Sequence, residues 1–179
     1  MEKIILKETR SDLAKLFQGK GAEIGVEQGM FSEVICQNSP GVKLYCVDAW
    51  APYRAYVDHR RKDKLERFYW RTRKRLHKYG CKVVRKPSME AVKDFENQIL
   101  DFVYIDANHS YEFVKEDLRE WAKKVKPGGI VSGHDYKVIP SRKGYYDVIR
   151  AVDEYCIENG YDLYVYAGEE FPSWMFYKR

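Results

Sequence analysis

The sequence predicts an α/β fold, a doubly wound sheet of seven mostly parallel strands in which the last strand is antiparallel. Short apolar runs alternate along the chain with longer runs of helical periodicity, which is typical of parallel sheets covered on both faces. The last two apolar runs have no helix between them, which favours an antiparallel final strand. A length of 179 residues fits one domain, so we expect a single domain over residues 1–179.

Each expected element has its own local signal. The predicted strands are short apolar runs at residues 22–26, 44–47, 82–85, 102–105, 129–132, 163–166 and 174–177. The predicted helices repeat apolar residues at three- and four-residue steps and cover residues 10–17, 31–37, 63–79, 89–95, 111–125 and 146–159. Gly80 is expected to end the third helix, and the Pro127-Gly128-Gly129 run the fifth.

Composition excludes several classes of protein. With 45% apolar and 33% charged residues, the chain is neither disordered nor of low complexity. No apolar run reaches the roughly 18 residues of a membrane span, and the apolar stretch at the start is too short for a signal peptide. We therefore expect a cytoplasmic protein with no membrane partner. The cysteines, Cys36, Cys46, Cys81 and Cys156, form no C-x-x-C pair, which favours free thiols.

Positive charge is concentrated in one part of the chain. The net charge is +5, but residues 54–86 hold 14 Lys and Arg against three acids, a local excess of about +11. Within this stretch the basic helical segment at about 54–80 includes the amphipathic helix 63–79, whose outer face is basic. Two interpretations stay open: a solvated helix face, or a surface for an anionic substrate or a nucleic acid.

The turn after the first predicted strand has features of a nucleotide site. Gly25 and Gly29 let the backbone approach a ligand where the next helix begins. A dinucleotide fingerprint would need glycine at positions 27 and 30, which hold Glu27 and Met30, so a pyrophosphate site is not expected. Asp48, 19 residues after Gly29 at the end of the second strand, is placed to accept ribose hydroxyls. This favours an adenosine-bearing ligand, although any tight α/β turn can use such glycines.

Acids and imidazoles follow the fourth and fifth predicted strands. Asp106 ends the fourth strand, His109 follows it, and His134 and Asp135 end the fifth. Adjacent strand ends lie about 5 Å apart, so we expect these side chains to converge on one cleft. The set suits Mg²⁺ or Mn²⁺, which would lower the pKa of a substrate hydroxyl, while a neutral imidazole could take its proton. The alternatives are a loop cap for Asp106 and a purely structural His109.

Five segments together resemble a known family. They are EIGVEQG at 23–29, YCVDAW at 45–50, VVRKPSMEA at 83–91, LDFVYIDANHSY at 100–111 and VKPGGIVSGHDY at 125–136. Over about residues 20–155 the chain resembles the class I S-adenosylmethionine-dependent methyltransferases, most of all the small branch that includes the macrocin-type sugar O-methyltransferases. The resemblance implies a Rossmann-like methyltransferase fold.

The resemblance also implies a set of cofactor-binding residues. They are Glu23, Gly25, Gly29, Asp48, Ser88, Met89 and Asp106. The first three would line the methionine portion of S-adenosylmethionine, Asp48 would hold the ribose, and Ser88 with Met89 would lie at the adenine. The chain departs from the family at Glu27, where the glycine-rich loop usually has glycine.

By the same resemblance, the metal ligands would be Asp106, Asp135 and, as a third, His134, where relatives more often have a carboxylate or amide. Asp106 and His109 are the catalytic candidates, with His109 as the base. The expected activity is transfer of a methyl group to a hydroxyl of a small-molecule or carrier-linked, sugar-like acceptor, assisted by Mg²⁺ or Mn²⁺. Arg142 and Lys143, with the basic helix, would form a positive rim for an anionic acceptor; the alternative is two mobile surface segments whose charge has no specific role.

Two other functions stay open on the sequence. The basic helix with its aromatic residues is compatible with a nucleic-acid-binding protein or an RNA methyltransferase, although no Asn/Asp-Pro-Pro-Tyr motif is present. A cofactor-binding scaffold without catalysis is the third possibility, and the combination of Asp106, His109 and Asp135 argues against it. The sequence is compatible with a homo-oligomer and does not identify the acceptor.

Overall fold

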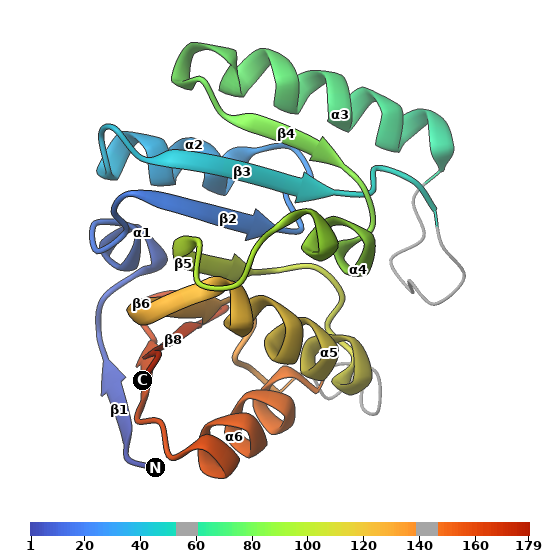
Figure 1. Ribbon diagram of the computed structural model, residues 1–179. Helices are drawn as coiled ribbons and strands as arrows, with labels where there is room; N and C mark the ends of the chain where they lie inside the picture. The colour runs from blue at the N-terminus through green and yellow to red at the C-terminus, as the bar shows by residue number, and fades with distance from the viewer. Residues whose placement is uncertain (53–60, 139–146) are drawn as a thin grey trace.

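The computed structural model describes residues 1–52, 61–138 and 147–179 and contains one mixed sheet (Figure 1). The strand order is β1-β7-β8-β6-β5-β2-β3-β4. All neighbouring strands are parallel except β8, which is antiparallel to both β6 and β7. The strands are β1 Lys3–Leu6, β2 Lys20–Ile24, β3 Lys43–Asp48, β4 Lys82–Arg85, β5 Leu100–Ile105, β6 Val125–Gly133, β7 Leu163–Tyr166 and β8 Ser173–Tyr177. The α/β fold with an antiparallel last strand is confirmed.

Helices cover both faces of the sheet (Figure 1). They are α1 Arg10–Ala14, α2 Met30–Asn38, α3 Lys62–Leu76, α4 Ser88–Ala91, α5 Tyr111–Trp121 and α6 Val148–Asn159, with short 3₁₀ turns at His77–Tyr79, Val92–Asp94 and Ala122–Lys124. Residues of α1, α2 and α3 belong to one buried apolar cluster, and residues of α4, α5 and α6 belong to the other. Along β5 the buried side chains alternate between the two clusters, as a strand covered on both faces requires.

The sequence prediction was wrong at two strands. It gave seven strands, whereas the sheet has eight, because β1 was missed. This strand is short, half exposed, and pairs only with β7, about 160 residues away, so its local sequence carries little signal. The fifth helix was extended to residue 125, but Val125 already pairs with Leu100. Strand β6 therefore begins before Pro127, which is tolerated beside a register irregularity.

The sheet order reverses between β2 and β5, and this position determines where a ligand can bind. Strand β2 has β3 on one side and β5 on the other, and their carboxyl ends lie at the same edge. In an open α/β sheet, ligands bind outside this edge at the reversal. Arg142, Lys143 and residues 54–60, all part of the expected positive rim or basic segment, lie outside the described residues. In the described part of the chain, no helix is both long and apolar enough to cross a bilayer.

Candidate active site

The turn after β2 brings two backbone segments into close contact. Gly25 has a φ of 90°, and a Cβ placed on it would lie 2.1 Å from the carbonyl oxygen of Asp106. Only glycine allows the turn to pass so close to the end of β5. Gly29, with a φ of 72°, is the N-cap residue of α2. Glu27, which replaces the expected glycine of the loop, also has a positive φ of 51°.

Asp48 ends β3 and stabilises this turn. One of its carboxylate oxygens, Oδ2, accepts hydrogen bonds from the backbone N–H groups of Val26 (3.0 Å) and Glu27 (2.9 Å). The other, Oδ1, accepts the N–H of Trp50 at 2.7 Å. Carboxylates that accept backbone N–H groups hold a loop firmly. Asp48 therefore organises the turn.

A cavity of about 710 Å³ lies at the carboxyl edge of the sheet. Six of the seven cofactor-binding residues expected from the sequence line it: Glu23, Gly25, Asp48, Ser88, Met89 and Asp106. The seventh, Gly29, does not line the cavity and instead begins α2. The cavity is within the size range of small-molecule and cofactor sites.

A buried acid on α5 lies beside Ser88 and was not expected from the sequence. Ser88 donates a hydrogen bond to Asp117 and accepts one from the indole N–H of Trp121 at 2.8 Å. Burial raises the pKa of Asp117 to about 7, although the hydrogen bond from Ser88 opposes the rise. Asp117 also lines the cavity. The sequence did carry a signal for Asp117. This acid lies among the apolar residues of an amphipathic helix, and a carboxyl group buried at such a position needs a hydrogen-bond partner.

Glu23 on β2 is a second buried acid at the cavity. Its side chain accepts a hydrogen bond from Ser32 of α2, and the residue is 2% exposed. Burial raises its pKa to about 8, the Ser32 bond opposes the rise, and the nearby Asp106 contributes to it. The carboxyl group is therefore largely protonated at neutral pH. A cationic group entering the cavity would favour its ionised form.

Arg10, at the start of α1, supplies a cation to the cavity wall. Its guanidinium lies 5.1 Å from the ring centroid of Phe31, and its Nε lies 3.5 Å from a carboxylate oxygen of Glu169. The sequence did not indicate this position, because it depends on the packing of α1 against α2. The cavity therefore has one cationic group near the buried Glu23.

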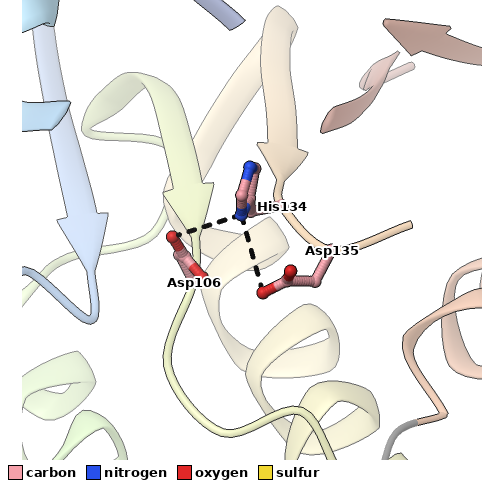
Figure 2. A group of neighbouring side chains, drawn as sticks. All are labelled: Asp106, His134 and Asp135. Carbon is pink, nitrogen blue, oxygen red and sulfur yellow. Dashed lines mark ion pairs between the residues drawn. The ribbon is translucent and has the colours of Figure 1, made fainter. Parts of the chain in front are cut away.

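The strand ends of β5 and β6 bring together the four polar residues that the sequence placed there. Figure 2 shows Asp106, His134 and Asp135, whose candidate ligand atoms all lie within 4.8 Å of one another. The Nδ1 atom of His134 lies 3.7 Å from Oδ2 of Asp106 and 3.5 Å from Oδ2 of Asp135. His109, from the segment after β5, lies 2.8 Å from Asp135 and 3.4 Å from Asp106.

The two carboxylates hold protons on the two imidazoles. Burial disfavours the charged form of His109, but the bonds to Asp106 and Asp135 outweigh it and raise the pKa to about 9. Burial also disfavours the charged form of His134, but the bond to Asp135 and the charges of Asp106 and Asp135 together outweigh it and raise the pKa. Conversely, bonds from both imidazoles lower the pKa of Asp135 far below its ordinary value despite burial. In this arrangement His109 is a proton donor to the carboxylates.

The donor set at these strand ends fits a divalent ion. Two carboxylates and an imidazole are acceptable ligands for Mg²⁺ or Mn²⁺, and the separations of 3.5 and 3.7 Å approach the ~3 Å between adjacent ligands of an octahedral ion. Asp135 has a φ of 59°, a conformation uncommon outside glycine, and such conformations are frequent at functional sites. The Nε2 atom of His134 is buried without a hydrogen-bond partner in the described structure.

Known proteins with related sequences or folds add a second line of information. A long uncharacterized protein of Sinorhizobium fredii is 26% identical over 120 residues, a match that covers 66% of this chain. The chain spans about 13% of the length of that curated relative.

Solved structures share the fold at low identity. An O-methyltransferase of Bacillus cereus, solved with S-adenosylhomocysteine, is 12% identical with a TM-score of 0.63; the match covers 94% of this chain and 80% of that one. An rRNA methylase of Streptococcus thermophilus is 14% identical with a TM-score of 0.62, and the match covers 94% and 93%. At such identities the similarity shows the fold, which serves different acceptors in these proteins.

The family itself is shown by the sequence. The profile of the methyltransferase domain matches residues 22–136, from β2 to the residue after Asp135. This range includes the turn at Gly25, Asp48 and the polar cluster at the ends of β5 and β6. The chain belongs to the methyltransferase domain family.

Proposed function

We propose that this chain transfers a methyl group from S-adenosylmethionine to a hydroxyl of a small-molecule or carrier-linked, sugar-like acceptor, with the help of Mg²⁺ or Mn²⁺. The observation that carries the proposal is the single cavity that contains the Gly25 turn, Asp48 and Asp106. The resemblance to the macrocin-type sugar O-methyltransferases supports a hydroxyl acceptor. We also propose that all 179 residues form one catalytic domain, since the sheet takes strands from both ends of the chain.

The cavity residues fit the two ends of the methyl donor. Arg10 would pair with the carboxylate of the methionyl group, and Glu23 would accept its ammonium. Asp48, which lines the cavity, would accept a ribose hydroxyl while it keeps the glycine turn in place. Ser88 and Met89 would contact the adenine, with Asp117 fixing the Ser88 hydroxyl.

Isothermal titration calorimetry of three variants separates these roles. Binding of S-adenosylhomocysteine is compared with binding of 5′-methylthioadenosine, which lacks the amino-acid end. Arg10→Gln should weaken the binding of S-adenosylhomocysteine at least tenfold, as expected for the loss of one charge-assisted contact. The same variant should leave the binding of 5′-methylthioadenosine unchanged. Asp48→Asn should weaken the binding of both ligands. The control variant Asp101→Asn, at the opposite edge of the sheet, should weaken the binding of neither. No saturable heat with the wild-type protein would refute the proposed donor.

Four side chains at the ends of β5 and β6 have proposed roles in the methyl transfer itself. Asp106, His134 and Asp135 would hold the divalent ion, which when bound supplies Lewis acidity that lowers the pKa of an acceptor hydroxyl. His109 is the proposed base, because its Nε2 lies within 3.4 Å of both carboxylates and so beside the place where that hydroxyl would bind. Asp106 and Asp135 hold a proton on this imidazole, and a divalent ion on the same carboxylates would offset their charge, so that His109 could lose that proton and accept the one from the hydroxyl. The buried walls of the cavity would exclude water from the sulfonium methyl.

The metal assignment has a test that does not need the acceptor. Electron paramagnetic resonance of added Mn²⁺ should show binding to the wild-type protein, and Asp135→Asn should abolish it. Asp147→Asn, an acid outside the cluster, is the control. If the wild-type protein binds S-adenosylhomocysteine but shows the same free-Mn²⁺ signal as Asp135→Asn, the proposed metal site is refuted.

A second candidate function, RNA methylation, is favoured by one surface. Trp70 of α3 is 56% exposed beside a shallow hollow whose cationic lining residues are Arg67, Arg71 and Lys74. Asp63 and Glu66 also line the hollow, and Asp63 pairs with Arg67 at 3.3 Å, so Arg71 and Lys74 supply the positive charge beside the indole. An exposed indole beside such cations is suited to stack on unpaired bases. Arg75 does not belong to this surface, because it pairs with Glu33 of α2 at 2.6 Å.

Fluorescence anisotropy with a single-stranded RNA tests this candidate. The variant carrying Trp70→Ala, Arg71→Gln and Lys74→Gln should lose at least tenfold in affinity, and the wild-type affinity should fall steeply with salt. A control with two charges removed from α5, at Lys115 and Arg119, should bind as the wild type does. Equal weakening by both sets would show a general charge effect and refute the site.

A further inference from the structure

Two cysteine thiols lie in contact at a place outside the proposed methyl-transfer cavity. Cys36 is in α2 and Cys81 immediately precedes β4, so 45 positions separate them in the chain. Their sulfur atoms are 3.5 Å apart. Neither residue lines the cavity. A third thiol, that of Cys46 on β3, lies next to this pair and donates a hydrogen bond to Ser32 at 3.6 Å.

The thiol pair is held by contacts on both sides. Arg75, near the end of α3, forms an ion pair of 2.6 Å with Glu33, one turn before Cys36 on α2. Tyr79, two residues before Cys81, accepts a hydrogen bond from Gln37, the residue after Cys36. These contacts fix the end of α3 against α2. Formation of a disulfide needs the two sulfurs to approach from 3.5 Å to about 2.05 Å.

The two thiols are not equivalent. Cys36 is 8% exposed, whereas Cys81 is only partly buried. The contacts with Cys36 and Cys46 lower the pKa of the Cys81 thiol, and the contact with Cys81 together with burial raises the pKa of Cys36. A partly exposed thiolate beside a second thiol is the arrangement of a thiol that reacts first and a thiol that resolves.

We propose that Cys81 and Cys36 form a thiol–disulfide exchange site for low-molecular-weight disulfides of the glutathione type. The Cys81 thiolate attacks one sulfur of the small disulfide, whose S–S bond breaks and releases one thiolate. Cys36 then loses its proton to solvent and attacks the Cys81 sulfur of the mixed disulfide, which releases the second thiolate. Counted from two protein thiols, the protein loses two electrons and two protons, one of them when the Cys81 thiolate forms, and the small disulfide is reduced to two thiols.

The disulfide would constrain the part of the chain that supports the cavity. The closed loop, residues 36–81, contains β3 with Asp48 and the whole of α3. A cross-link of this span restricts the unfolded chain, so the oxidised protein should melt roughly 5 °C or more above the reduced protein.

Mass spectrometry of the full-length protein tests the site directly. The reduced protein is incubated with oxidised glutathione, its remaining thiols are alkylated, and its peptides are mapped. The expected product is a Cys36–Cys81 disulfide with Cys46 and Cys156 alkylated. Cys36→Ser should stop at a glutathione mixed disulfide on Cys81, and Cys81→Ser should form neither product. Cys156→Ser, which removes a buried thiol of α6, should still form the Cys36–Cys81 bond.

Three results would overturn the proposal. They are a cross-link between Cys46 and Cys81 in its place, retention of all four thiols at the highest glutathione disulfide ratio, and a Cys36–Cys81 bond that forms only in urea. The expected difference in melting temperature between the oxidised and reduced proteins does not depend on any bound ligand. The thiol test therefore stays valid even if the methyl-transfer proposal fails.

Discussion

The buried carboxyl group of Glu23 should make the stability of this protein fall as pH rises. Burial raises its pKa from the ordinary value of 4.5 to about 8 and outweighs the Ser32 hydrogen bond. Below pH 4.5 the group is protonated in the folded and unfolded states, so it contributes no pH dependence. Between pH 4.5 and about 8 only the unfolded chain releases the proton, and stability decreases until the effect is complete above pH 8.

The size of this effect follows from the same two values. A rise from 4.5 to about 8, at ~1.4 kcal/mol per pH unit, corresponds to roughly 5 kcal/mol of unfolding free energy. For a chain of this length, that corresponds to about 10–20 °C in Tm. Glu23→Gln keeps the shape of the side chain and an oxygen that can accept the Ser32 hydroxyl. The variant therefore removes the titration and retains the contact.

Thermal melts from pH 5 to pH 9 provide the assay. The Tm of Glu23→Gln should be close to that of the wild type at pH 5 and exceed it increasingly toward pH 9. Glu33→Gln is the matched control on α2: ion pairs with Arg75 and Lys78 lower the pKa of Glu33, so this variant should gain no stability at high pH. If the Tm difference between Glu23→Gln and the wild type stays constant from pH 5 to pH 9, the Glu23 carboxyl is not neutral in the folded protein.

Three further outcomes are expected. Gly25→Ala should destabilise the protein by several kcal/mol more than Gly41→Ala in urea unfolding. Both glycines have a positive φ, but only at Gly25 would the added Cβ lie against backbone atoms. Asp117→Asn should flatten the pH dependence between pH 4 and 7, since burial raises the pKa of Asp117 to about 7; melts matching the wild type at each pH would contradict this. Ser88→Ala should weaken the binding of 5′-methylthioadenosine and of S-adenosylhomocysteine to the same extent in calorimetry. Weaker binding of only one of the two ligands would contradict the proposed contact between Ser88 and the adenine.

Local sequence was sufficient for most of the elements and for the place of the site. Helical periodicity located all six helices to within a few residues, because amphipathic patterns follow directly from which face is buried. The convergence of Asp106, His134 and Asp135 was predictable as well, since carboxyl ends of neighbouring parallel strands always share one edge. Such inferences need only chain order and the rules of parallel sheets.

Contacts between distant segments were not predictable from the sequence. Strand β1 forms only because β7 offers it an edge, and Arg10 reaches the cavity only because α1 packs beside α2. The Cys36 and Cys81 sulfurs meet through the packing of α3 against α2, and Asp48 binds backbone amides of a turn 22 residues earlier. Side-chain packing determines these distances, and packing depends on the whole folded chain, whereas periodicity and propensity describe only neighbours along it.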